Sequence, residues 1–367
     1  MTETISFARG APSLDIVDVK GLRGAAERAF ANDPGAVTAY GTSVGYPPLR
    51  AWIAEHHGVA REQVLVTNGS MQADAFLFDA LVAPGDSVIV ERPTYDRTLL
   101  SLRDRGADVR MVELESDGID VAALERVLTA GANPTLAHII PNFQNPAGYT
   151  LSVDKRGRLL ELARAYGFMI FEDDPYVALR FEGEELPSIR SMDGQTVVYA
   201  SSFSKTVCPG IRVGYLVGPE DVIATIAKLA TSTYISPSMV SQGIVYEFCR
   251  SGALERSIET VKAALRERAA TLCEALRRKL PDARFVEPQG GYFLWVELPR
   301  GTDVDALFTA AARRGVAFVK GSDFVLDGGG SCLRLAYSGV RPAKIEDGIR
   351  RLADAYAEVE AVGAPAA

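Results

Sequence analysis

Lys205 is the residue of this sequence with the clearest capacity for covalent chemistry. It lies in the stretch SSFSKTVCPGIR, where serines follow an apolar run and Arg212 comes seven residues later. A lysine amine becomes a nucleophile toward carbonyl carbons when burial or nearby cations lower its pKa. Most lysines lie instead in exposed loops. Lys205 is one of only eight lysines in the chain. We expect it to be a Schiff-base nucleophile if residues at the other strand ends can bind the ring and the phosphate of an aldehyde cofactor.

An acidic cluster, FEDDPY, follows another apolar run. It places Glu172, Asp173 and Asp174 at the end of a predicted strand, where an unpaired carboxylate is costly. A carboxylate that faces a protonated pyridine nitrogen would be paired, and this pair keeps the ring an electron sink. A metal site or a solvated acidic turn is the alternative, but the ligand spacing of a calcium loop is missing. The cluster therefore favours a pyridine partner, and we predict no metal.

Two further stretches could hold a phosphate group. TNGSMQ places Ser70, Met71 and Gln72 between a strand and a helix, where backbone N–H groups and the helix dipole attract anions. The stretch matches neither G-x-G-x-x-G nor G-x-x-x-x-G-K-[ST], so it does not indicate a dinucleotide or ATP. The other members of a monophosphate cup would be Ser202, Ser204 and Arg212.

Aromatic and amide side chains follow two other predicted strands. Tyr95 in RPTY offers a flat ring that can stack on an aromatic cofactor, although a half-buried core tyrosine is the commoner role. Asn142 and Asn145 lie in NFQNPAG beside a glycine turn, and most Asn-Pro pairs only form turns. Neither stretch is specific alone, and each becomes meaningful together with Lys205 and the acidic cluster.

The elements that must position these residues form an alternating pattern. Seven short apolar runs between residues 64 and 217 predict strands, and helix-like segments such as 70–82 and 152–166 separate several of them. This alternation indicates an α/β fold with a mostly parallel, seven-stranded sheet sandwiched by helices. The carboxyl ends of such strands gather ligands, and the stretches described above follow those ends.

A second, smaller unit follows this sheet. The segment 220–280 predicts helices, including a long connecting helix, and strand-like and helical runs alternate after it. We therefore expect a large domain over 36–274 and a smaller α+β domain built from 1–35 and 275–367.

The composition argues against several classes of protein. The chain has 367 residues, 47% of them hydrophobic, and a net charge of −8, so we expect no nucleic-acid or membrane partner. No apolar stretch approaches the ~20 residues that span a bilayer. The first residues do not resemble an export signal, so we expect a cytoplasmic protein. The cysteines and histidines show neither metal-ligand spacing nor a disulfide framework.

The chemical stretches recur together, in this order, in one known family. The chain resembles the fold-type I pyridoxal 5'-phosphate (PLP) aminotransferases of class I/II, within the branch of 2-aminoadipate and kynurenine aminotransferases and the catalytic domains of MocR-type regulators. Nearly the whole chain is covered, by YGTSVGYPPLR, TNGSMQ, PTYD, PNFQNPAG, EDDPY, SSFSKTVCPGIRVGY, GGYFLWVEL and LRLAYS. MocR regulators carry an N-terminal DNA-binding domain, whereas FARGAPS starts here at residue 7, so we expect a stand-alone enzyme.

The resemblance implies a role for each matching residue. Lys205 would form the internal aldimine and then carry the proton between Cα and the C4′ atom of the cofactor. Asp173 would pair with the pyridine nitrogen, and Tyr95 would stack on the ring. Tyr176 and Asn145 would hydrogen-bond the phenolic oxygen. The remaining implied contacts are the phosphate ligands Ser70, Met71, Gln72, Ser202, Ser204 and Arg212, and the substrate-binding Arg334, with Asn145 beside it.

Other matching and departing positions concern the subunits and the substrate. Tyr40 resembles the tyrosine that reaches the phosphate of the neighbouring subunit, which implies a homodimer with shared active sites. Arg9 stands where relatives often have a small residue, Lys320 where proline is frequent, and Cys208 where alanine is usual. Arg9 and Lys320 would add positive charge near the entrance. That charge either selects acidic side chains or is ordinary surface charge, and the sequence leaves both open.

We expect the protein to move the amino group of an α-amino acid to a 2-oxo acid, with glutamate and 2-oxoglutarate as the second pair. The alternative is another PLP reaction, namely elimination or replacement, decarboxylation, racemisation or oxidation. Pocket geometry rather than motif identity decides between them. A non-catalytic sensing module would have lost a cofactor residue, whereas all of these are present: Lys205, Asp173, Tyr95 and Arg334.

Overall fold

The large unit is built on one mixed sheet. The computed structural model describes residues 3–363, and it contains all seven predicted strands. The strand order is β2 (Val64–Thr67), β9 (Gly214–Val217), β8 (Val197–Ser202), β7 (Met169–Asp173), β6 (Pro134–Ile139), β3 (Ser87–Arg92), β4 (Asp108–Glu115) and β5 (Gly118–Ile119). β9 and β5 run antiparallel to their neighbours, and the other pairs are parallel. The two-residue β5, too short to form an apolar run, is an eighth strand beyond the seven expected.

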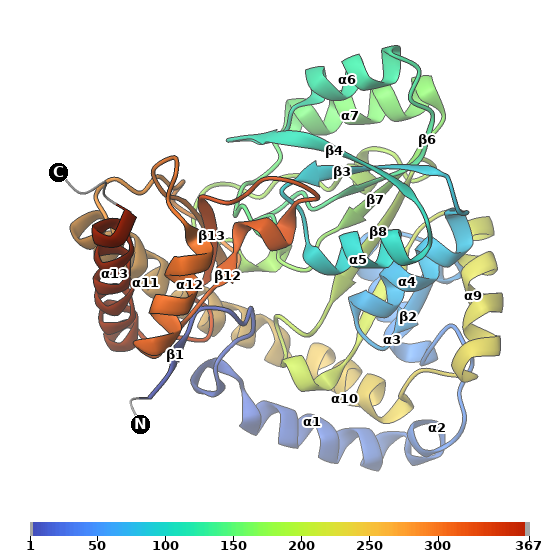
Figure 1. Cartoon of the computed structure of the whole chain (residues 1–367). Coiled ribbons are helices and arrows are strands. Elements are labelled where there is room, and N and C mark those ends of the chain that lie inside the picture. The colour runs from blue at the N-terminus through green and yellow to red at the C-terminus, as the bar shows by residue number, and fades with distance from the viewer. Residues whose placement is uncertain (1–2, 364–367) are drawn as a thin grey trace.

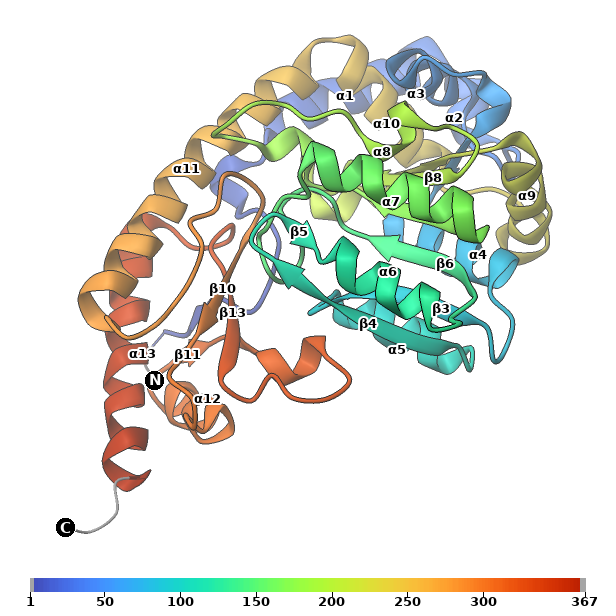
Figure 2. The same cartoon turned by 90° about the horizontal axis from the view of Figure 1, so that it is seen from above.

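Helices cover both faces of this sheet, as the sequence pattern predicts (Figure 1 and Figure 2). They are α3 (Pro47–His57), α4 (Ser70–Leu81), α5 (Asp96–Asp104), α6 (Val121–Thr129), α7 (Val153–Tyr166), α8 (Ile189–Met192), α9 (Glu220–Tyr234) and α10 (Met239–Arg250). Val88 and Val90 of β3 pack in one core with α4, α5 and α9. Ile89 points the opposite way, into a core with α6, α7 and α8, because successive strand residues alternate between faces.

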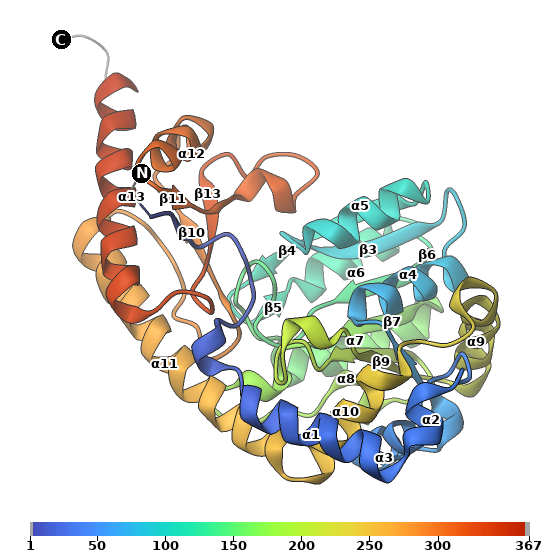
Figure 3. The same ribbon diagram turned by 90° about the horizontal axis from the view of Figure 1, so that it is seen from below.

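The smaller unit combines two short sheets with helices (Figure 3). β10 (Phe293–Glu297), β13 (Cys332–Ala336) and β12 (Val319–Lys320) form an antiparallel sheet, and β1 (Ile5–Ser6) pairs in parallel with β11 (Val316–Ala317). The helices are α12 (Val304–Arg313) and α13 (Pro342–Gly363). One core holds Phe7 together with Leu294, Leu335 and Ile349, so the chain's start is part of this unit.

Helix α11 (Ala253–Lys279) connects the two units, as the sequence pattern indicates. Its first residues lie in the core beneath α10, and from Val261 onward it lies in the core of the smaller unit. Two helices precede α3, namely α1 (Val19–Asn32) and α2 (Pro34–Thr38). Ala25 and Ala29 of α1 share a core with α10. This packing favours grouping 19–35 with the large sheet, whereas the other expected domain limits stay a prediction.

Short 3-10 turns complete the secondary structure of the described residues, at Leu14–Ile16, Arg61–Gln63, Val177–Leu179, Pro209–Ile211 and Gly321–Phe324. Among the helices within 3–363, none is both long and apolar enough to cross a membrane.

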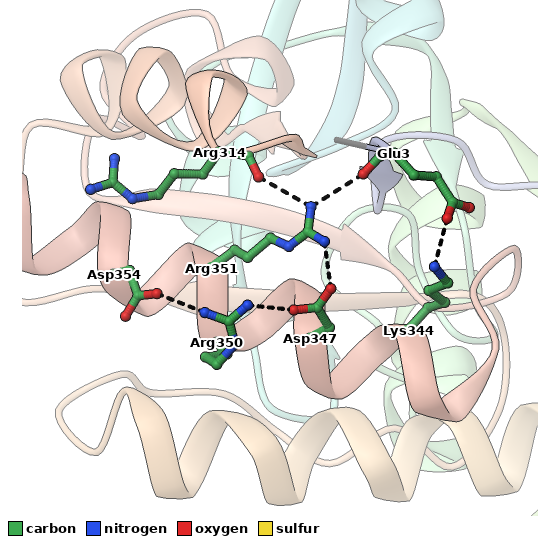
Figure 4. Close-up of polar contacts among 7 residues, drawn as sticks. All are labelled: Glu3, Arg314, Lys344, Asp347, Arg350, Arg351 and Asp354. Carbon is green, nitrogen blue, oxygen red and sulfur yellow. Dashed lines mark hydrogen bonds and ion pairs between the residues drawn. The ribbon is translucent and has the colours of Figure 1, made fainter. Parts of the chain in front are cut away.

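The start of the chain is anchored to α13 by Arg351 (Figure 4). The guanidinium of Arg351 donates to the backbone oxygens of Glu3, at 3.1 Å, and of Arg314, at 3.2 Å. It also pairs with Asp347 at 2.5 Å, and its side chain is only 14% exposed. These bonds fix the strand that leads into residues 8–10, which line the functional site described below.

Replacing this anchor should lower stability. We expect Arg351→Ala to reduce the free energy of unfolding by about 1–2 kcal/mol, because a net contribution of about 0.5–1.5 kcal/mol is typical of each hydrogen bond lost. Urea unfolding followed by circular dichroism measures the change. Arg350→Ala is the matched control, since this 53% exposed side chain contacts only Asp347 and Asp354 of its own helix within the described chain, and such pairs contribute about 0.5 kcal/mol or less. Equal losses in both variants would contradict the anchoring role.

Candidate active site

The predicted chemical residues meet in two adjoining pockets at the carboxyl ends of the strands. The smaller pocket, of about 120 Å³, is lined by Ser70, Met71, Tyr95, Asn145, Asp173, Tyr176, Ser202, Ser204, Lys205 and Arg212. The larger, of about 460 Å³, shares Lys205 and Tyr176 with it and is also lined by Arg9 and Arg334. The parallel sheet therefore brings together residues that the sequence separates by more than a hundred positions.

Lys205 lies where the two pockets meet. Its Nζ donates to the backbone oxygen of Gly10 at 2.9 Å, and it lies 5.5 Å and 5.3 Å from the ring centroids of Tyr176 and Tyr292. The hydroxyl of Tyr292 donates to the backbone oxygen of Lys205 at 2.9 Å. The amine is thus held by the N-terminal segment on one side and by aromatic rings on the other.

The surroundings of Lys205 favour its neutral form. Burial lowers the pKa of the amine, Arg334 and Arg212 lower it further, and Asp173 opposes them, so that the pKa falls to about 8. A lysine amine with this pKa has a substantial uncharged fraction near neutral pH. It can therefore act as a nucleophile and as a base.

The acidic residues of the FEDD stretch point in different directions. Glu172 accepts two backbone N–H groups at the start of α8, each at 2.8 Å, and Asp174 accepts from Asn142 at 2.8 Å. Asp173 lines the smaller pocket, and its Oδ1 is buried without a hydrogen-bond partner among residues 3–363. The Nε2 of His138 lies 3.5 Å from its Oδ2. Asp173 therefore offers one unpaired acceptor to a positively charged donor in the pocket.

Donor groups surround the other end of the smaller pocket. Arg212 adopts a left-handed φ of 49° and donates to the Oγ of Ser204 at 3.2 Å. Gly69, with a φ of 86°, permits this approach, because a Cβ there would lie 2.1 Å from the Nη2 of Arg212. Helix α4 starts next to Gly69 without a side-chain cap. The N–H of Gln72 donates to the backbone oxygen of Gly69 at 3.2 Å, so the N–H groups of Ser70 and Met71 are the ones available to an anion.

Arg334 extends from β13 into the larger pocket. It donates to the Oδ1 of Asn145 at 2.8 Å and to the backbone oxygen of Ala8 at 2.7 Å. Its guanidinium lies 4.4 Å and 4.8 Å from the ring centroids of Phe293 and Phe324, and the residue is only 7% exposed. Its Nε has no partner within residues 3–363. A fixed, desolvated guanidinium with a spare donor suits the planar carboxylate of an amino acid.

Some residues singled out in the sequence lie elsewhere. The Oε1 of Gln72 accepts from the backbone N–H of Asn68 at 2.9 Å, so its side chain closes the loop before α4. Lys320 donates to Asp305 at 2.7 Å and does not line either pocket as described. Of the two roles that the sequence leaves open for Lys320, the pair with Asp305 favours ordinary surface charge. Tyr40 is 88% exposed and lines neither pocket.

Three polar residues in or beside these pockets were not among the site residues predicted from the sequence. Asp74 lines the smaller pocket and Arg97 the larger, while Tyr292 holds the backbone of Lys205. Asp74 comes one helical turn after Ser70 in the apolar stretch SMQADAFLF, and a lone carboxylate on that face is a signal that could have found it. The other two look like ordinary helix and strand residues.

Comparisons with known proteins agree with this geometry. Residues 2–352 match the family model of aminotransferase class I and II. This chain belongs to the class I and II aminotransferases. It is 34% identical to 2-aminoadipate transaminase of Thermus thermophilus, over 95% of this chain and 89% of that protein. It is 31% identical to aromatic-amino-acid aminotransferase 1 of Thermococcus litoralis, over 97% and 89%. The crystal structure of alpha-aminoadipate aminotransferase from Thermus thermophilus with N-(5'-phosphopyridoxyl)-L-leucine has a TM-score of 0.93 at 33% identity, covering 98% of this chain and 93% of that one.

This aminotransferase is a PLP-dependent enzyme, and its smaller pocket fits the cofactor. The unpaired oxygen of Asp173 suits a protonated pyridine nitrogen. The donors around Arg212 and the start of α4 suit the phosphate. The buried amine of Lys205 lies in the same pocket and suits the aldehyde.

The lowered pKa of Lys205 should be visible in its reactivity. In the apo-enzyme, labelling of Lys205 by acetic anhydride should be half-maximal near pH 8, because only the neutral amine reacts. Peptide mass spectrometry after labelling from about pH 6 to about pH 10 measures the profile. Lys320 is the internal control, since its bond to Asp305 raises its pKa and should move its labelling to higher pH. If both lysines were half-labelled at the same pH, this result would contradict the claim that the pocket lowers the pKa of Lys205.

Proposed function

We propose that this aminotransferase takes the amino group of α-amino acids with acidic side chains and passes it to a 2-oxo acid, with glutamate and 2-oxoglutarate as one pair. The observation that carries the proposal is the placement of Arg9 in the same pocket as Arg334 and Lys205. One guanidinium would hold the α-carboxylate, and a second cation remains for the side chain. The name of the Thermus relative, 2-aminoadipate transaminase, supports an acidic donor.

Arg9 is the better candidate of the two further arginines in the larger pocket. Arg97 lies 3.4 Å from Asp96, which partly neutralises it. Arg9 makes no ion pair with another residue in the described part of the chain. Its charge is therefore available to a substrate.

Each residue then has a physical task. Arg334 binds the α-carboxylate through its spare donor, and Asn145 holds the guanidinium in place.

Lys205 is the base: its neutral Nζ accepts the proton from Cα and later returns a proton during transfer. When bound, PLP supplies the electron sink for the negative charge that develops at Cα. Asp173 supports that sink by pairing with the positive ring nitrogen. Burial by Tyr176 and Tyr292 keeps water from the amine.

We also propose a homodimer with shared active sites. Tyr40 is 88% exposed, and Met71 at the rim of the smaller pocket is 49% exposed. A second copy of the chain could cover Met71 and bring its own tyrosine to the phosphate end of the pocket. The cytoplasmic location expected from the sequence stays a prediction.

Arg9 provides the test of substrate choice. Arg9→Ala should raise KM about fivefold for glutamate and 2-aminoadipate and leave KM for leucine unchanged, because fivefold corresponds to about 1 kcal/mol for a partly exposed charge pair. Steady-state kinetics with each donor and saturating 2-oxo acid measures the change. Lys320→Ala is the matched control and should affect no donor, because Asp305 already pairs with that charge. Equal increases for acidic and apolar donors would contradict the proposed role.

A further inference from the structure

Asp74 is a buried acid of the cofactor pocket that the proposed function leaves without a role. It lies on α4, lines the smaller pocket together with Asp173 and Lys205, and is only 6% exposed. Its Oδ1 is buried and has no hydrogen-bond partner among residues 3–363. A buried polar atom without a partner is costly, so its position at a ligand pocket calls for a physical reason.

Other buried acids near the pocket differ from Asp74 because they have protein donors. The Oε2 of Glu91 accepts from the backbone N–H of Ile140 at 3.1 Å and from the side chain of Gln144 at 3.0 Å. Glu172 accepts two backbone N–H groups at the start of α8. Those carboxylates therefore stabilise neighbouring backbone segments through hydrogen bonds. Asp74 instead lines the pocket that fits the cofactor, with its Oδ1 unpartnered.

The neighbourhood of Asp74 favours a neutral acid. Burial raises its pKa well above the usual range, and the charge of Asp173 raises it further. Two carboxyl groups that interact in a water-poor pocket do not both ionise readily, so one of them keeps its proton. The Nε2 of His138 lies 3.5 Å from the Oδ2 of Asp173, whereas the side chain of Asp74 makes no ion pair in the described chain. Burial and the neighbouring charge both favour the protonated form of Asp74, so Asp74 is the member of the pair that holds the proton.

We propose that Asp74 is a positioning residue of the cofactor site, a neutral acid whose O–H is the donor available to Asp173. The pair then carries one negative charge, which matches the single positive charge of a protonated pyridine nitrogen. The hydrogen bond from Asp74 orients the carboxylate of Asp173 toward that nitrogen. This inference rests on the proposed pairing of Asp173 with the ring, and it does not depend on which amino acid is the donor.

Two substitutions at position 74 separate the roles of charge, donor and volume. Asp74→Asn keeps a neutral donor and should hold PLP with a Kd within about threefold of the parent enzyme. Asp74→Leu removes the donor and should weaken PLP binding about tenfold. In a sample loaded with ¹⁵N-labelled PLP, the ring nitrogen should be protonated in the parent and in Asp74→Asn, and less so in Asp74→Leu. Fluorescence titration and ¹⁵N NMR are the two readouts.

Thermal unfolding of the apo-protein excludes a merely structural role. Asp74→Leu should change the Tm of the apo-protein little, because the loss of the bond to Asp173 is offset by the removal of a buried Oδ1 that has no partner. Glu91→Leu is the matched control and should lower the Tm, since that acid has donors to lose. The proposal is overturned if Asp74→Asn binds PLP as weakly as Asp74→Leu, if Asp74→Leu binds PLP like the parent, or if Asp74→Leu lowers the apo Tm as much as Glu91→Leu does. None of these outcomes bears on the choice of amino donor, which the Arg9 kinetics test separately.

Discussion

The active site depends on holding the amine of Lys205 and the guanidinium of Arg334 in one buried pocket, although the two groups repel each other. Lys205 and Arg334 repel one another, and this repulsion is part of what lowers the pKa of Lys205. Backbone oxygens of Ala8 and Gly10 accept from the two side chains. These neutral acceptors stabilise the pair in place without restoring the charge that would keep the amine protonated. The N-terminal segment is therefore as much a part of the site as the strand ends.

Several parts of the fold serve that arrangement. The sheet supplies Asp173 at the end of β7 and Lys205 in the turn that follows the adjacent β8, and the smaller unit supplies Arg334 from β13. Helix α11 runs through the cores of both units and joins them. Figure 3 shows the first residues crossing from the smaller unit toward the sheet. The pocket for the amino acid is thus made by both units and the chain's start.

The sequence predicts this site where a residue type is unusual for its position. Lys205 and Asp173 are charged groups directly after buried strands, and the structure places both in the smaller pocket. The sequence could not decide the role of Lys320, because its partner Asp305 lies on another element, and such a pairing leaves no trace in local sequence. Helix α1 packs on α10 through small alanines that fit many surfaces, so its place beside the large sheet could not be foreseen. Asp74 could have been found from the sequence, because it is a single acidic residue on the apolar face of a predicted helix.

The most direct test of the account is a half-reaction with no acceptor. Purified PLP-loaded enzyme is mixed with excess L-glutamate, no 2-oxo acid is added, and 2-oxoglutarate is counted per subunit. The account predicts about one equivalent and then no further product, because the amino group stays with the enzyme until an acceptor arrives. Continuous turnover with release of ammonia, carbon dioxide or peroxide would contradict amino-group transfer as the reaction of this pocket, and a complete absence of 2-oxoglutarate would contradict the proposed pair.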